Sequence, residues 1–90
     1  MTLLARIDEN GTLMYRMAET VEADFGDALL AGEVTADILR DAVLRCARCE
    51  AADFCESWLE VNEARKAATG TAPEAPDFCA NRDMMNNLRP

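Results

Sequence analysis

Apolar residues recur three and four positions apart along most of this 90-residue chain. That spacing is typical of amphipathic helices, and no long segment shows the period of two that half-buried strands require. Residues that interrupt helices are few, with four glycines and three prolines. The pattern therefore predicts an all-α fold, a small bundle of four to five short helices in one domain over residues 1–90.

The first two predicted helices meet near residue 24. Thr12 caps a helix over residues 12–23 after a break at Asn10-Gly11, and we expect residues 1–11 to be loosely ordered. The apolar stripe of this helix consists of Leu13, Met14, Met17 and Val21. A shorter helix over residues 24–31 stops at Gly32. Its inward side chains are predicted to be Phe25, Leu29 and Leu30.

Three further helices are predicted after Gly32. Thr35 caps the first, whose inward face carries Ile38, Leu39, Ala42, Val43, Cys46 and Cys49. A turn over residues 50–53 leads to a helix over residues 53–68, with an apolar face of Phe54, Cys55, Trp58, Leu59 and Val61. Residues 69–77 contain one Gly and two Pro and form an internal loop. Asn81 caps a last short helix through Leu88, which contains Met84 and Met85.

The acidic balance of the chain limits its partners. There are 17 acidic and 9 basic residues and no histidine, for a net charge of −8. Residues 17–39 hold six acids and no Lys or Arg: Glu19, Glu22, Asp24, Asp27, Glu33 and Asp37. Nucleic acids and anionic membranes need a basic face, so we expect neither as a partner. The acidic segment is either a solvated face or a docking surface for a basic partner protein.

Four cysteines supply the candidate chemistry. Cys46, Cys49, Cys55 and Cys79 have the spacing C-x2-C-x5-C-x23-C. Residues 1–11 lack the apolar core of a signal peptide, so we expect a cytoplasmic location, where thiols stay reduced. In that compartment clustered cysteines bind metal more often than they form disulfides, although disulfides and unliganded thiols are lesser alternatives.

The predicted helices can bring the four cysteines together. Cys46 and Cys49 share one helix face, and Cys55 lies in the first turn of the following helix. Cys79 returns across the loop and arrives just before the last helix, whose dipole favours a thiolate. Two arginines next to the first pair also favour thiolates, namely Arg45 and Arg48. We therefore expect the bundle to close around a four-cysteine site shielded from water by Phe54, Trp58 and Phe78.

A [4Fe–4S] cluster is the first interpretation of this site and zinc is the second. Structural zinc sites usually use two C-x2-C turns with Gly or Pro, whereas this chain has one and has neither residue between Cys46 and Cys55. Three clustered cysteines with a distant fourth are typical of a [4Fe–4S] cluster. The predicted function is electron transfer or redox or oxygen sensing. The alternative is a zinc-stapled helical module that binds a protein partner through its acidic face.

An enzymatic function is not expected. A thiol oxidoreductase using Cys46 and Cys49 would normally carry its motif after a strand in a βαβ unit, and no strand is predicted. The chain also has no histidine to act as a base.

Two resemblances are carried by the cysteine residues. Residues 43–59, which read V-x-R-C-x2-C-x5-C-x2-W-L, together with F-C-x-N at residues 78–81, resemble a small uncharacterised bacterial family. Its members have an acidic helical N-terminal half with a G-x-[LV]-[ST] step, here residues 32–35. The match extends from about Thr12 onward and implies that the four cysteines act as a unit; it implies no activity.

The cysteine triplet is also similar to that of WhiB-like iron–sulfur regulators. In that family the distant fourth cysteine precedes the triplet, whereas Cys79 follows it. The glycine-rich turn and the basic tail of the family are missing from this chain. The similarity therefore favours a [4Fe–4S] cluster and does not extend to DNA-linked regulation.

Overall fold

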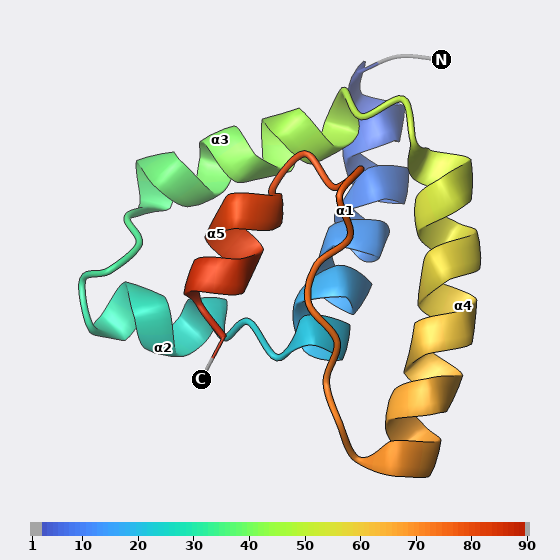
Figure 1. The fold of residues 1–90 in the computed structure, drawn as a ribbon. Helices are drawn as coiled ribbons and strands as arrows, with labels where there is room; N and C mark the ends of the chain where they lie inside the picture. Colours follow the sequence, from blue (N-terminus) through green and yellow to red (C-terminus); the bar gives the residue numbers. More distant parts are fainter. Residues whose placement is uncertain (1–2, 90) are drawn as a thin grey trace.

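The computed structural model describes residues 3–89, with side chains from residue 8 onward, and contains five helices (Figure 1). They are α1 (Leu3–Val21), α2 (Phe25–Leu30), α3 (Ala36–Ala47), α4 (Ala52–Thr69) and α5 (Arg82–Asn87). Residues 3–89 contain no strand, so the all-α prediction is confirmed. Over the same residues, none of the helices has the length and apolar character needed to cross a membrane.

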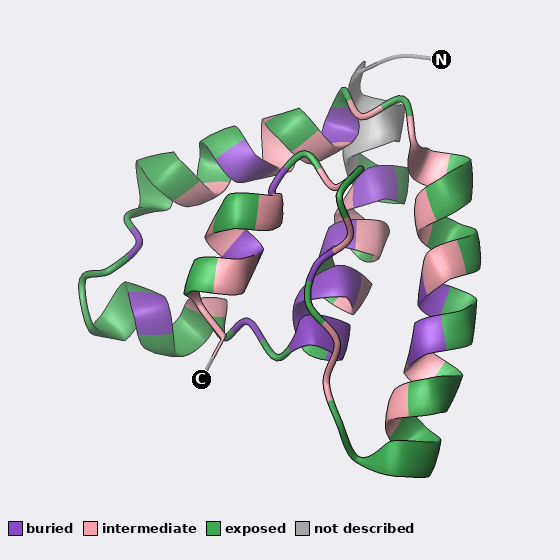
Figure 2. Cartoon of the chain, viewed as in Figure 1, coloured by how far each residue is buried: buried purple, intermediate pink, exposed green. Residues whose placement is uncertain are grey.

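Helix α1 is the element against which the others pack. It contacts α3, α4 and α5, and residues 70–81 run across it between α4 and α5 (Figure 1). Its buried face carries Met14, Met17, Ala18 and Val21, none more than 5% exposed, as Figure 2 shows in purple. Burying one Met or Val side chain contributes about 1.5–3 kcal/mol. The apolar stripe predicted on this helix is thus confirmed as the centre of the core.

The predicted start of the first helix at Thr12 was wrong, because α1 begins at Leu3 and continues through Asn10 and Gly11. The buried Asn10 side chain donates to the carbonyl oxygens of Cys46 (2.7 Å) and Ala47 (3.4 Å) at the end of α3. These tertiary hydrogen bonds offset the low helix propensity of Asn10 and Gly11. Thr12 is not a cap, since its hydroxyl donates to the Asp8 carbonyl (3.3 Å) within the helix. Loose order over residues 1–11 stays a prediction, and residues 1–2 lie outside the described part.

The later breaks between helices agree with the predictions. Thr35 caps α3 by accepting a hydrogen bond from the Ile38 amide (3.2 Å). Gly32 and Gly70 have φ of +76° and +75°, a conformation that favours glycine after α2 and α4. Residues 70–76 are irregular, which matches the predicted loop to within one residue at each end.

Several apolar residues predicted to face inward are exposed. They are Leu29 (40%), Leu30 (89%), Ile38 (43%), Phe54 (72%) and Val61 (55%). Helix α2 has only six residues and buries Ala28 instead of the two leucines. Helix α4 is apolar on two faces, and the face with Cys55, Leu59 and Asn62 packs inward. Periodicity alone could not decide between two apolar faces of one helix.

The C-terminal end of α1 is closed by cations from distant parts of the chain. Its last turn contains no basic residue. Lys66 on α4 donates to the Glu19 carbonyl (2.6 Å), and Arg89 donates to the Val21 carbonyl (3.2 Å). Both cations donate to carbonyl groups in the last turn of α1 and oppose the negative end of the helix dipole. They also fix α4 and the C-terminal segment to the end of α1.

Replacing Gly11 by Ala should stabilise the protein, because Gly11 lies inside α1 and an added Cβ would meet no atom within 4 Å. The expected gain is about 0.5–1 kcal/mol, from a smaller loss of backbone entropy on folding. Gly32→Ala is the matched control and should destabilise, since φ is positive there. Urea unfolding of the three proteins measures both effects, and a loss of stability in Gly11→Ala would contradict an unbroken α1.

Candidate metal centre

The four cysteines come from α3, the turn that follows it, α4 and the segment before α5. Cys46 lies in the last turn of α3, and Cys55 lies in the first turn of α4, where its amide donates to the Ala51 carbonyl (2.8 Å). Cys79 lies before α5 in a turn closed by its amide on the Pro76 carbonyl (3.0 Å). Cys49 was predicted on the helix face of Cys46 but lies beyond the end of α3, in the turn that leads to α4. All four are half-buried thiols.

These thiols share one cavity of about 30 Å³, lined by all four cysteines. The other lining residues are Leu13, Met14, Met17, Phe78, Ala80, Asn81 and Met85, so the wall is largely apolar and comes from α1 and the tail. Every pair of the four thiols is close enough to interact electrostatically: three pairs involve Cys46, two more involve Cys55, and the last joins Cys49 and Cys79. The convergence expected from the spacing is therefore present.

Burial favours the protonated form of three of these thiols, Cys46, Cys55 and Cys79. It raises the pKa of Cys46 from 9.0 to about 12, and the negative charge that would develop on the other three cysteines adds to the effect. The pKa of Cys55 is raised to about 11 by burial, then by Cys79 and Cys49. The pKa of Cys79 is also raised, mainly by burial. Binding of a cation would reverse this balance, because metal ligation requires thiolates.

Two cations that the sequence did not indicate, Arg16 and Arg82, lie near enough to act on the thiols. Arg16 favours the thiolate of Cys55, and Arg82 favours that of Cys79, although neither outweighs burial. Arg16 is held by Glu63 through two hydrogen bonds, Nη2 to Oε1 (2.6 Å) and Nε to Oε2 (3.2 Å). Arg16 escaped the sequence reasoning because it is 39 positions from Cys55 and only the packing of α1 on α4 brings the two near.

Two buried asparagines fix the end of α3 relative to its neighbours. Asn10, on α1, bonds the carbonyls of Cys46 and Ala47, and its own carbonyl accepts from the Cys46 thiol (3.2 Å). Asn81 was predicted to cap α5, but its side chain makes no capping hydrogen bond. Its amide instead donates to the Ala42 carbonyl (2.9 Å) and its oxygen accepts from Arg45 (2.8 Å). Asn81 thus attaches the segment carrying Cys79 to α3, and Arg45 supports this contact.

The aromatic residues near the cysteines have different roles. Phe78 lines the cavity, and its ring lies against Phe54, with centroids 6.5 Å apart and ring planes at 43°. Phe54 is 72% exposed, so it covers Phe78 from outside and does not enter the cavity. Trp58 packs against the core cluster and does not line the cavity. Of the three predicted shielding residues, Phe78 has the position that the role requires.

The donor set suits a thiophilic metal, but the side chains are not drawn together around one point. Within the described residues, no three His, Cys, Asp or Glu side chains are grouped as the ligands of a single ion. A cavity of about 30 Å³ has room for about one or two waters. One sulfur already has a backbone partner, since the Ala51 amide donates to Cys49 Sγ (3.4 Å). Such N–H···S contacts stabilise a thiolate and are present before any metal binds.

Together these features define an all-helical domain in which four thiols from separate parts of the chain meet at one cavity. The chain belongs to a family of unknown function (DUF6455), whose family model matches residues 1–90. Comparison with curated proteins gives no match, and comparison with solved structures gives none either. The expected membership of an uncharacterised family is confirmed. The cysteine motif as a family signature and the WhiB-like similarity stay predictions.

The raised thiol pKa values predict how the stability of the metal-free, reduced protein depends on pH. A raised folded-state pKa means that the folded state holds its protons more tightly than the unfolded state. The stabilisation is therefore complete below about pH 9 and is lost as the pH rises through 11 and 12. Chemical unfolding at a series of pH values should show this decline, and Cys46→Ser should show less of it. An equal decline in both proteins would contradict the account.

Proposed function

We propose that this protein binds a [4Fe–4S] cluster through Cys46, Cys49, Cys55 and Cys79 and uses it for electron transfer or for sensing oxygen or redox state. The observation that carries the proposal is the convergence of four thiols from α3, α4, the turn between them and the segment before α5 on one cavity beside α1. Residues from distant parts of the sequence meet there, so the arrangement belongs to the fold as a whole.

A bound centre would explain why the fold places four thiols together. A chain of 90 residues buries only somewhat over ~60% of its unfolded surface, so its own core provides a thin stability margin. Metal–thiolate bonds add folding free energy, on the order of 10 kcal/mol for structural zinc sites. They would also join α3, α4 and the tail, which are otherwise held together through α1 and a few side-chain hydrogen bonds.

The spacing of the cysteines along the chain supports a cluster over a single ion, since three are clustered and the fourth is distant. A tetrahedral zinc ion needs four sulfurs at about 2.3 Å, and the described side chains are not grouped in that way. A cluster separates its ligands more widely, because each thiolate binds a different iron atom. The cavity is small for a cluster core, so loading requires the thiols and Phe78 to move outward. Phe78 is 36% exposed and lies in the segment between α4 and α5, outside any helix.

The residues around the site would tune such a centre. A [4Fe–4S] cluster supplies one-electron exchange when bound, and its potential depends on charge, hydrogen bonds to sulfur and access of water. The net charge of −8 would lower the potential, whereas Arg16 and Arg82 would raise it. Met14, Met17 and Phe78 would limit access of water. A cluster bound by reduced thiols fits a cytoplasmic location, and we include that location in the proposal.

Zinc is the second candidate, and the small cavity is the observation that favours it. About 30 Å³ has room for one ion, and slight rotation of the four side chains could bring the sulfurs closer. The metal would then be structural, and the function would lie in contacts with a protein partner. The same preparation distinguishes the two candidates, because zinc gives a colourless protein without iron or sulfide.

Protein purified without oxygen should contain iron and acid-labile sulfide and should show the broad visible absorption of iron–thiolate charge transfer. Cys46→Ser and Cys79→Ser should each lose most of the iron, since each removes one of four ligands from a different element. Val61→Ala is the matched control: it changes an exposed apolar residue of α4 that does not line the cavity and leaves all four thiols intact. Iron and sulfide analysis together with the visible spectrum measures all four proteins.

A colourless, iron-free wild-type protein prepared in this way would overturn the cluster proposal. Stoichiometric zinc in its place, lost in the two Cys→Ser variants, would establish the second candidate. Retention of full metal content by both Cys→Ser variants would contradict the four-cysteine site for either metal.

A further inference from the structure

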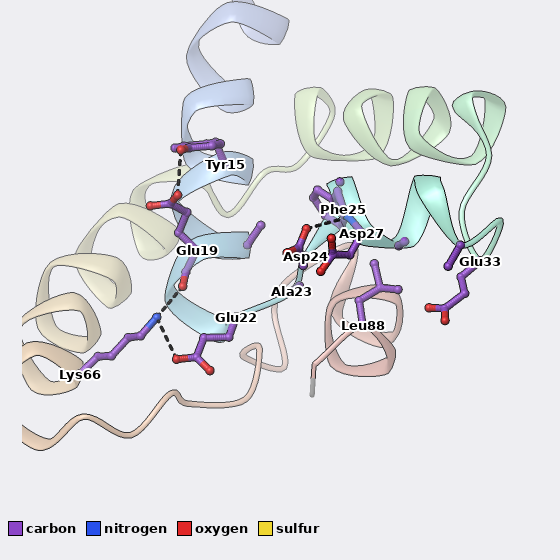
Figure 3. A pocket seen from close by; sticks show the side chains of 14 residues that line it. Tyr15, Glu19, Glu22, Ala23, Asp24, Phe25, Asp27, Glu33, Lys66 and Leu88 are labelled. Atoms are coloured by element: carbon purple, nitrogen blue, oxygen red, sulfur yellow. Dashed lines mark hydrogen bonds and ion pairs between the residues drawn. The ribbon is translucent and has the colours of Figure 1, made fainter.

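A second feature of the molecule, separate from the cysteines, is a groove of about 950 Å³ at the C-terminal end of α1 (Figure 3). It lies between the second half of α1, helix α2 and the end of α5, and Lys66 of α4 reaches it from one side. None of the four cysteines lines it. The groove therefore has its own chemistry, and its occupant need not be the ligand of the cysteine site.

Negative charge dominates the rim of the groove. Five of the fourteen lining residues are acidic and one is basic. The acids are Glu19, Glu22, Asp24, Asp27 and Glu33, and Figure 3 shows them spread along the groove from α1 past α2. The single cation, Lys66, already contacts Glu22 (3.6 Å) and the Glu19 carbonyl (2.6 Å). The C-terminal end of α1 adds the negative end of its dipole at the same place.

The floor of the groove is apolar and made mainly of small side chains. Ala18, Ala23 and Ala28 are buried, and Phe25 and Leu88 are half-buried beside them. Small side chains allow the backbone of another segment to approach closely, as they do where two helices cross. A concave apolar floor between rows of carboxylates matches an apolar stripe flanked by cationic side chains.

The side chain of Lys66 is an example, within this protein, of an ammonium group bound at the rim of the groove. Its Nζ is bound jointly by a carbonyl oxygen at the end of α1 and by the carboxylate of Glu22. Farther along, Asp27 and Glu33 are exposed and present the same kind of acceptor to any lysine or arginine that enters. Residues 17–39 contain no Lys or Arg, and none of the six ion pairs of the described residues involves Asp27 or Glu33.

We infer that this groove docks a Lys/Arg-rich amphipathic helix of a partner protein. The apolar stripe of that helix would lie on the alanines and Phe25, and its cations would face the carboxylates of α1, α2 and Glu33. The interaction is independent of the metal proposal, because the groove and the cysteine cavity are lined by different residues.

The test uses the full chain and three synthetic peptides. The first is an amphipathic helix of leucine, alanine and lysine, the second is a scrambled peptide of the same composition, and the third has glutamate in place of lysine. Calorimetric titration should show binding of the first peptide, at least about tenfold weaker binding of the second and no binding of the third. Added salt should weaken the first interaction, since exposed charges are screened. Amide chemical shifts should change at residues lining the groove.

A matched pair of double variants tests whether the peptide binds at the groove. Asp27→Asn with Glu33→Gln removes two charges from the groove and should weaken binding of the first peptide several-fold. Asp53→Asn with Glu60→Gln removes two charges from the exposed surface of α4 and should leave it unchanged; Asp53, like Asp27, lies in the first turn of its helix. Equal loss in the two variants, equal binding of the scrambled peptide, or no binding of the first peptide would overturn the inference.

Discussion

The packing of α3, α4 and the tail against the single helix α1 determines where the chemistry of this protein can lie. Each of those three elements carries at least one cysteine at the point where it meets α1 or its neighbour. Met14 and Met17 of α1 form the floor of the cavity, and Asn10 holds the end of α3 in place. Loss of this helix would therefore remove the core and the thiol site together.

The same helix carries two sites of different character along its length. The thiol cavity lies beside its middle, where apolar burial makes negative charge unfavourable and raises the pKa of Cys46 and Cys55. The groove lies at its C-terminal end, where exposed carboxylates and the helix dipole make negative charge prevalent. In the thiol cavity, thiolates would need a bound metal cation to stabilise them. In the groove, the carboxylates favour a cationic partner. We propose one role for each environment.

Local patterns in the sequence predicted most of the helices. The helix bounds and side-chain roles that the patterns missed depend on tertiary contacts. The cap at Thr35 and the loop before Cys79 depend on local chemistry, so they were predicted well. The start of α1 depends on hydrogen bonds from Asn10 to α3, 36 positions away, so it was missed. Asn81 was assigned as a cap for the same reason: its partners, Ala42 and Arg45, are near only in the fold. The convergence of the cysteines could be predicted because the predicted helices placed all four at or near helix ends, although Cys49 lies in the turn beyond α3 and not on its face.

The central claim is that the four thiols hold a metal centre as a unit, and native mass spectrometry of anaerobically isolated protein tests it most directly. The account predicts a mass above that of the 90-residue chain by four iron and four sulfide atoms, less the protons that the thiols release. A mass equal to that of the bare chain, or lower by the hydrogens lost on forming disulfides, would contradict it.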